Sequence, residues 1–142
     1  MSATKELKEA YIKDKSGQRY NKDGATMMQL LLLYSPRFLE LDALWIDALV
    51  EAQQDARDSN GWSCLMYLLC SRMLGDFDFG CRRFQALLQQ QQYWVDSQST
   101  TAAIVLCYNS PQLLSHEWAT GLVRQQSGKT DDKGMTALVS LF

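Results

Sequence analysis

One short phrase occurs four times along this chain, and its repetition limits the possible folds more than any other feature. The copies share an Asp or Asn, a glycine-type position three residues later, and a Ser or Thr two residues after that. They are NKDGATMM at 21–28, DSNGWSCL at 58–65, DSQSTTAA at 96–103 and DDKGMTAL at 131–138. The glycine-type positions 24, 61, 99 and 134 are 37, 38 and 35 residues apart. Self-similarity at a nearly fixed period of this size indicates a protein built from one small recurring unit.

Each phrase has the chemistry of a turn that leads into a helix. The Asp or Asn side chain can accept hydrogen bonds from the turn backbone, glycine permits a positive φ, and Ser or Thr is a favoured helix N-cap. We therefore expect positive φ at Gly24, Gly61 and Gly134, and also at Ser99, which replaces glycine in the third copy. The sequence predicts four turns, each followed by a helix.

Two kinds of helix are expected after these turns. The segments LLLY, LMYLLC and AIVLCY follow the first three phrases and are apolar nearly all round, which indicates helices covered on most sides. Ser35-Pro36 and Ser110-Pro111 have the pattern of an N-cap followed by proline at the first position of a second helix. After Pro36 the apolar residues take helical spacing opposite a polar face, at Leu41, Leu44, Trp45, Ala48, Leu49 and Ala52. The pattern predicts buried inner helices that alternate with amphipathic outer helices.

A turn, a buried helix, a short connection and an outer helix, repeated every 33 residues or slightly more, is approximately the ankyrin unit. The sequence resembles a divergent ankyrin array of the D-x-x-G-x-T-A-L-M kind found in protist proteins, and TDDKGMTALV at 130–139 is the best match. It departs from the usual T-P-L-H, since Met27 and Gln29 hold the Pro and His positions of the first copy, and Gly-His between the helices is absent. The resemblance covers nearly the whole chain. It implies an all-α, ankyrin-like helical-repeat solenoid of about three to four degenerate repeats in a single domain, residues 1–142.

Both ends of the array are expected to be open. Residues 7–24 parallel residues 122–134, so the chain begins in the middle of a repeat, and it also ends within one. Repeat arrays normally end in units with a polar outer face. The apolar side of Leu7–Ile12 and the face formed by Leu138, Leu141 and Phe142 therefore predict self-association.

Charge and composition narrow the classes of partner. With 14 basic and 16 acidic residues, the net charge of -2 gives no general attraction to nucleic acid or anionic lipid. No signal peptide or membrane span is expected, because the apolar runs are short and the first residues mix charged and small side chains. Cys64, Cys70, Cys81 and Cys107 lack C-x-x-C spacing and lie in apolar stretches, which indicates reduced core thiols. We expect a cytoplasmic protein.

The DFDFG run at 76–80 contains the D-F-G of protein kinases and a D-x-D of the kind that binds metals. A kinase needs a glycine-rich loop, a strand lysine and a catalytic loop, and this chain has no room for them. We instead expect Asp76 or Asp78 to cap the following helix and the two phenylalanines to fix the loop to the core.

Other reactive residues also fit structural roles. His116 is the single histidine, so a Cys/His pair or a triad would need it, and its place at an expected helix start predicts a solvated first-turn residue. Ser63 and Cys64 are the expected N-cap and first helical residue, a place that Thr takes in the other copies. The QQQQ run at 89–92 is expected to be a solvated face, and the Tyr-Trp pair at 93–94 to pack the outer helix against the next turn. No catalytic residue, metal site or cofactor is expected.

The sequence therefore predicts a protein-protein interaction module. Ankyrin-like proteins bind through turn tips and the inner-helix face, so the resemblance implies a partner-binding set at positions that vary between the phrases. This set comprises Lys22, Asp23, Ala25, Ser59, Asn60, Trp62, Ser97, Gln98, Thr100, Asp132, Lys133 and Met135.

The role of Trp62 and two rival functions stay open. Trp62 follows the turn glycine directly, so its ring either anchors a partner or lies across the neighbouring turn around Ala25 or Thr100. The first rival function is a structural subunit that docks into a larger assembly through its uncapped ends. The second is a small enzyme built around His116 or the two aspartates of residues 76–78.

Overall fold

The computed structural model describes residues 19–139, which form six α-helices and two 3-10 helices. In chain order these are α2 (Met27–Tyr34), η1 (Pro36–Glu40), α3 (Leu44–Gln53), α4 (Cys64–Leu69), α5 (Arg82–Gln91), α6 (Ala102–Asn109), η2 (Pro111–Ser115) and α7 (Glu117–Gln125). Within this range there is no strand, only an isolated bridge between Val95 and Thr101. The predicted all-α class is confirmed. None of the described helices has the length and apolar character that crossing a membrane requires.

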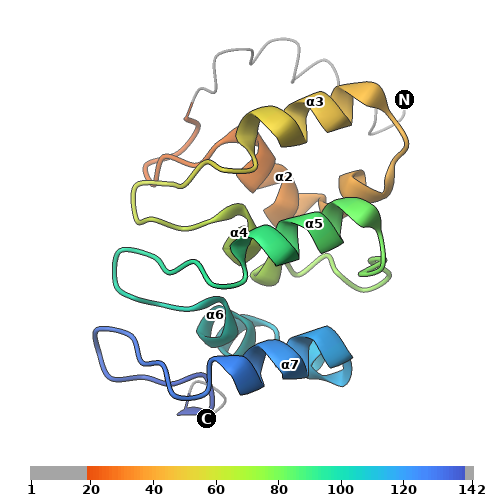
Figure 1. Cartoon of the computed structure of the whole chain (residues 1–142). Coiled ribbons are helices and arrows are strands. Elements are labelled where there is room, and N and C mark those ends of the chain that lie inside the picture. Colours follow the sequence, from red (N-terminus) through yellow and green to blue (C-terminus); the bar gives the residue numbers. More distant parts are fainter. Residues whose placement is uncertain (1–18, 140–142) are drawn as a thin grey trace.

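The helices lie in two layers (Figure 1). The inner helices are α2, α4 and α6, and α4 contacts both of the others. The outer helices are α3, α5 and α7, and each contacts the inner helix that precedes it in the chain. The loops between successive helix pairs all project from the same side of the molecule, one below the next. The pairs therefore follow one another through the molecule in sequence order.

The inner helices begin at the Ser and Thr caps that the repeated phrase predicts. The side chains of Thr26, Ser63 and Thr101 each accept a hydrogen bond from the backbone N–H three residues later, at 3.2 Å. Thr136 makes the same bond in the fourth copy. All six residues of α4 are buried, because α4 lies between the two other inner helices. The helix that is apolar all round is thus covered on most sides, as expected.

The turn conformation is also confirmed. Gly24, Gly61 and Gly134 have φ of 74, 81 and 78°, and Ser99 has φ of 63°. These values lie in the left-handed region, which glycine adopts without strain because it has no Cβ, whereas residues with a side chain are strained there.

Three buried glutamines join the end of each outer helix to the start of the inner helix in the same pair. Through Oε1, Gln53, Gln91 and Gln126 accept a hydrogen bond from the second backbone N–H of α2, α4 and α6, at 3.0–3.1 Å. Helix starts carry N–H groups without intrahelical partners, and these bonds satisfy one of them in each inner helix. Through Nε2, Gln91 and Gln126 also donate to the backbone carbonyls of Gln54 and Gln92 in the preceding pair.

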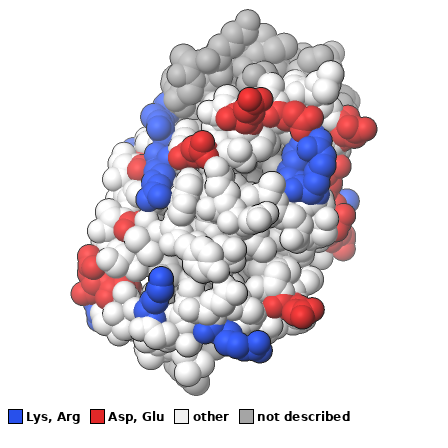
Figure 2. Space-filling model, viewed as in Figure 1, with Lys and Arg blue, Asp and Glu red and all other residues white. Residues whose placement is uncertain are grey.

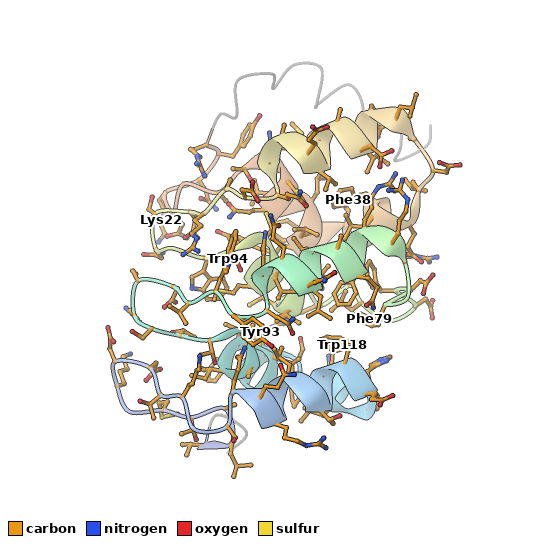
Figure 3. All side chains as sticks on the ribbon, in the orientation of Figure 1. Lys22, Phe38, Phe79, Tyr93, Trp94 and Trp118 are labelled. Carbon is orange, nitrogen blue, oxygen red and sulfur yellow. The ribbon has the colours of Figure 1, made fainter. Side chains whose placement is uncertain are left out.

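The prediction of a solvated face at 89–92 is therefore wrong for Gln91, which is fully buried. The Tyr-Trp pair after this run, labelled in Figure 3, contacts the preceding turn and the following outer helix instead of the next turn that the sequence predicts. Trp94 stacks on the guanidinium of Arg57 from the preceding turn, at 4.4 Å. The hydroxyl of Tyr93 donates to Gln125 at the end of α7.

The Ser-Pro pairs at 35–36 and 110–111 do not start the outer helices, which corrects a second prediction. Each proline opens a short 3-10 helix, and the outer helices begin later, at Leu44 and Glu117. Neither serine caps with its side chain. The second serine instead donates its Oγ hydrogen to the carbonyl of Leu69 in α4, at 2.6 Å.

This delayed start rotates the buried face of α3, so that it shares only part of the predicted stripe. Leu44 is 87% exposed, and Ala48 and Ala52 are exposed as well. Leu49 is fully buried as predicted, and Ile46, which lies outside the predicted stripe, is fully buried too. An extended segment separates η1 from α3, so the helical phase cannot be counted from the proline.

The loop before α5 differs from its predicted role in one respect. Asp78 Oδ1 accepts a hydrogen bond from the N–H of Gly80 and so stabilises the turn itself. Cys81 is the N-cap of α5 and makes no side-chain capping bond, so neither Asp76 nor Asp78 caps that helix. The two phenylalanines of the loop are buried, as predicted.

The predicted open ends are described only at Leu138, which is 61% exposed. Leu7–Ile12, Leu141 and Phe142 lie outside the described residues.

We predict that replacing Gly61 by Ala is more harmful than the same change at Gly134. Both glycines have positive φ, so each change adds left-handed strain of about 1 kcal/mol. A Cβ at position 61 would also lie 2.8 Å from the backbone N of Ser97, whereas a Cβ at position 134 would meet no atom within 4 Å. Gly61→Ala should therefore cost about 2 kcal/mol or more in urea unfolding, and Ser99→Gly should give a gain of under about 1 kcal/mol. Equal losses at positions 61 and 134 would contradict the close packing of the turns.

Candidate functional site

The four turns are built by the same set of hydrogen bonds. The first residue of each phrase accepts, through one side-chain oxygen, hydrogen bonds from the backbone N–H groups two and four residues later, at 2.8–3.0 Å. These residues are Asn21, Asp58, Asp96 and Asp131. The backbone N–H of the glycine-type position donates to the backbone carbonyl of the first residue of its phrase, at 3.0–3.1 Å. The tight turn is therefore held by a side chain within the phrase, as its composition predicts.

Backbone hydrogen bonds connect each turn to the next. Ser59 N donates to Asp23 O at 2.7 Å, and Ser97 N donates to Asn60 O at 2.9 Å. The third bond joins the last two turns, at 2.9 Å between Asp132 N and Gln98 O. In each case the second residue of a phrase donates to the third residue of the preceding phrase. The four turns consequently form one continuous row, which we call the turn row.

Most of the residues expected to meet a partner have exposed or half-buried side chains in the turn row. The exposed ones are Lys22, Ser59, Asn60, Ser97, Gln98, Asp132 and Lys133. The half-buried ones are Asp23, Trp62, Thr100 and Met135. Ala25 is fully buried, which corrects its assignment to the binding set. Its methyl group reaches less far than the larger side chains at the equivalent positions of the other turns.

Trp62 lies across the turn that follows it. Its Nε1 donates to Asp96 Oδ2 at 3.0 Å, and its ring meets the ring of Tyr67 edge to face, with centroids 5.8 Å apart. The sequence left two roles open for Trp62, an anchor for a partner or a contact across the neighbouring turn. The structure shows the contact across the neighbouring turn. The contact is to Asp96, four residues before Thr100.

Trp62 also forms a wall of a hollow beside the turn row, with a volume of about 390 Å³. The lining residues are Asp23, Asp58, Asn60, Trp62, Tyr67, Asp96, Ser97 and Gln98. We call this space the turn hollow. It joins three successive turns and the inner helix α4, which contributes Tyr67.

Three lining residues are absent from the predicted binding set: Asp58 and Asp96, which were expected only to stabilise their turns, and Tyr67, which the sequence analysis did not single out. Its hydroxyl donates to Asp58 Oδ2 at 2.6 Å. Burial, that hydrogen bond and the nearby negative charges of Asp58 and Asp23 raise the pKa of Tyr67 above its ordinary value. Tyr67 therefore stays a neutral hydrogen-bond donor. The only sequence signal for it was its place on an otherwise apolar helix.

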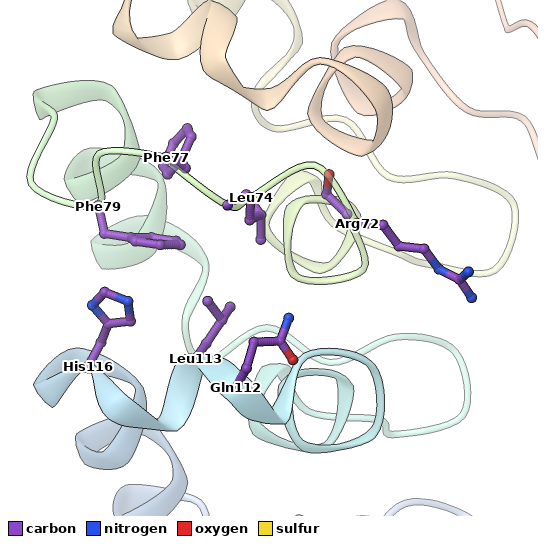
Figure 4. A pocket seen from close by; sticks show the side chains of 9 residues that line it. Arg72, Leu74, Phe77, Phe79, Gln112, Leu113 and His116 are labelled. Atoms are coloured by element: carbon purple, nitrogen blue, oxygen red, sulfur yellow. The ribbon is translucent and has the colours of Figure 1, made fainter.

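A second hollow, of about 370 Å³, lies between the loop before α5 and η2 (Figure 4). Apolar side chains of Leu74, Phe79 and Leu113 line it together with His116. His116 packs against Phe79 with ring centroids 4.8 Å apart and is half-buried, so the prediction of a solvated residue is wrong. Ser71 also lines this hollow, but its Oγ donates to the carbonyl of Leu33 at 2.7 Å. These contacts give His116 and Ser71 a packing or bonding role in the fold.

Ser63 and Cys64 are the N-cap and the first residue of α4, as the repeated phrase predicts. Ser63 caps α4, Cys64 is fully buried, and burial raises the pKa of the Cys64 thiol to about 12. All four cysteines are free. Among residues 19–139, no group of three or more His, Cys, Asp or Glu side chains is arranged to hold a metal ion.

Comparison with protein-family models gives no match for this chain, and comparison with curated proteins gives none either.

We predict that the thiols of the folded protein react slowly with a disulfide reagent. Burial raises the pKa of Cys64 and of Cys70 to about 12, and it also raises the pKa of Cys81 and Cys107. The thiolate is the reactive species, so at about pH 8 native Cys64 should react at least a hundredfold more slowly than in urea, where its pKa returns to about 8.5. Mass spectrometry of the labelled peptides identifies each thiol. Rapid labelling of native Cys64 would contradict its structural role.

Proposed function

We propose that this chain is an ankyrin-like repeat domain and that it binds another protein through the turn row. The recurrence of the same bonds in successive helix pairs supports the repeat assignment. The side-chain caps of the inner helices, the glutamine bonds and the turn bonds all recur at the spacing of the repeated phrase. Shared bonding at a fixed period is what a repeat array requires, because each unit must pack on its neighbours in the same way.

The observation that carries the binding proposal is that the turn row combines a hydrogen-bonded backbone, common to all four turns, with side chains that vary between them. The turn backbone is hydrogen-bonded within each phrase and to the next one, so the turns are rigid platforms. The side chains at the third position of the phrase differ from turn to turn: they are Asp23, Asn60, Gln98 and Lys133. A rigid frame with varied side chains lowers the ordering cost of binding and provides specificity.

A protein is the favoured kind of partner. The net charge of -2 gives no general attraction to phosphate backbones or anionic lipid. The residues with nucleophilic chemistry serve the fold, as Ser63 does when it caps α4. We therefore propose binding and not catalysis, and the free cysteines favour a reducing compartment such as the cytoplasm.

The test compares bulky charged substitutions in the turn row with one on an outer helix. Partners are first isolated from native extract with the wild-type chain, and the affinity of each is then measured with purified variants. Asn60→Arg and Gln98→Arg should weaken binding by about tenfold or more, because a large side chain there separates the surfaces. Gln89→Arg, on the exposed face of α5, is the matched control and should leave affinity unchanged.

Thermal melting of all three variants should be close to wild type, since all three side chains are exposed. Binding that is lost in Gln89→Arg but kept in both turn variants would contradict the proposed surface.

A further inference from the structure

The turn hollow combines two features that suit one kind of side chain. Its aromatic wall is the edge-to-face pair of Trp62 and Tyr67, which spans from the second turn to α4. Its polar wall includes three carboxylates, those of Asp23, Asp58 and Asp96, each from a different turn. Aromatic rings and carboxylates both attract cations, the rings through their negative faces.

Two of these carboxylates are held in place by the fold. Asp58 accepts hydrogen bonds from two backbone N–H groups and from the hydroxyl of Tyr67. Asp96 accepts two backbone bonds of the same kind and one from the Trp62 indole. These bonds fix the orientation of the carboxylates and of both rings before any ligand arrives. A preorganised site loses little freedom on binding.

The third carboxylate, Asp23, is available to a ligand. Within residues 19–139 its side chain makes no hydrogen bond or ion pair, while its backbone carbonyl accepts the bond from Ser59. Its substitution should therefore leave the turn row intact.

None of the residues that line the turn hollow is basic. The two arginines nearest to these residues in the chain interact with groups that do not line the hollow. Arg19 donates to the carbonyls of Gly24 and Arg57, and Arg57 donates to the carbonyl of Val95 and stacks on Trp94. The hollow thus has a negative lining that no lining side chain neutralises.

We propose that the turn hollow receives a cationic side chain, arginine or lysine, from the protein bound at the turn row. This inference rests on the proposed function and adds the chemistry of the partner. The charge of the hollow selects a cation, its aromatic wall accommodates the apolar stem and flat head of such a side chain, and its position beside the tips makes it accessible to an extended segment of the partner.

A defined probe tests the proposal without knowledge of the partner. The probe is the blocked tripeptide acetyl-Gly-Arg-Gly-amide, and its matched control carries citrulline, which has nearly the shape of arginine but no charge. Binding is followed through the indole N–H signal of Trp62 in two-dimensional NMR, assigned with Trp62→Phe. The arginine peptide should shift this signal to saturation, the shift should weaken as salt is raised, and citrulline should have no effect.

Comparison of Asp23→Asn with Asp132→Asn distinguishes the effect of a charge inside the hollow from the effect of the net charge on binding of the arginine peptide. Each variant removes one negative charge, and Asp132 lies in the turn row but does not line the hollow. Asp23→Asn should weaken binding of the arginine peptide by about threefold or more, and Asp132→Asn should leave it nearly unchanged. The amide spectrum of each variant verifies that the fold is retained.

The proposal is overturned if the arginine peptide does not shift the Trp62 signal, if citrulline shifts it equally, or if both Asn variants respond alike. These outcomes leave the proposed function standing when Asn60→Arg and Gln98→Arg still weaken an isolated partner. If the arginine peptide binds as expected but no partner is affected by the two turn variants, the proposed function fails and the cation site remains.

Discussion

The start of each inner helix presents a buried backbone N–H that must find a partner, and a glutamine from the outer helix provides it. Water cannot reach the N–H of Leu65 in the core, and an unpaired donor there would cost about 1–3 kcal/mol. Gln91 accepts from this N–H and donates its own amide hydrogen to a carbonyl of the preceding pair. The bond thus requires the end of α5 to lie at the start of α4. Gln53 and Gln126 impose the same geometry on the other two pairs.

This constraint determines where the turns lie. Because each outer helix ends beside the start of its own inner helix, the chain leaves every pair at the same side of the molecule (Figure 1). The turns then come close enough for the backbone bonds between successive phrases. The charged residues on the face seen in Figure 2 lie mainly around its edge, and its centre carries few of them. The turn hollow gathers three carboxylates next to two aromatic rings, beside the turns.

Local features of the sequence predicted local structure correctly. The turn bonds, the positive φ of Ser99 and the caps by Ser63 and Thr101 depend on residues within one phrase, and each of them was expected. Several of the features that were missed depend on contacts between distant residues. Gln91 lies in a polar run that looks solvated, and nothing in that run indicates its bond to a helix 26 residues away.

The same distinction explains the errors in the candidate site. The burial of Ala25, the contact of Trp62 with Asp96 and the place of Tyr67 in the hollow all arise from the packing of one turn or helix on another. The late start of α3 is a different kind of error, since Ser35-Pro36 is a local signal for a helix start and the chain forms a 3-10 helix there instead. Sequence periodicity identified which segments face the core as a whole, but not the phase of the outer helix.

The most direct test of this account is the stability of Gln91→Ala compared with that of Gln89→Ala. The two glutamines are neighbours in the same run of α5, but Gln91 is fully buried and Gln89 is exposed. Urea unfolding should show that Gln91→Ala loses about 2 kcal/mol or more, because it leaves the buried N–H of Leu65 without its partner, whereas Gln89→Ala should change stability by under about 0.5 kcal/mol. Equal and small effects of the two changes would mean that the glutamine bonds do not hold the helix pairs together, and would contradict the account.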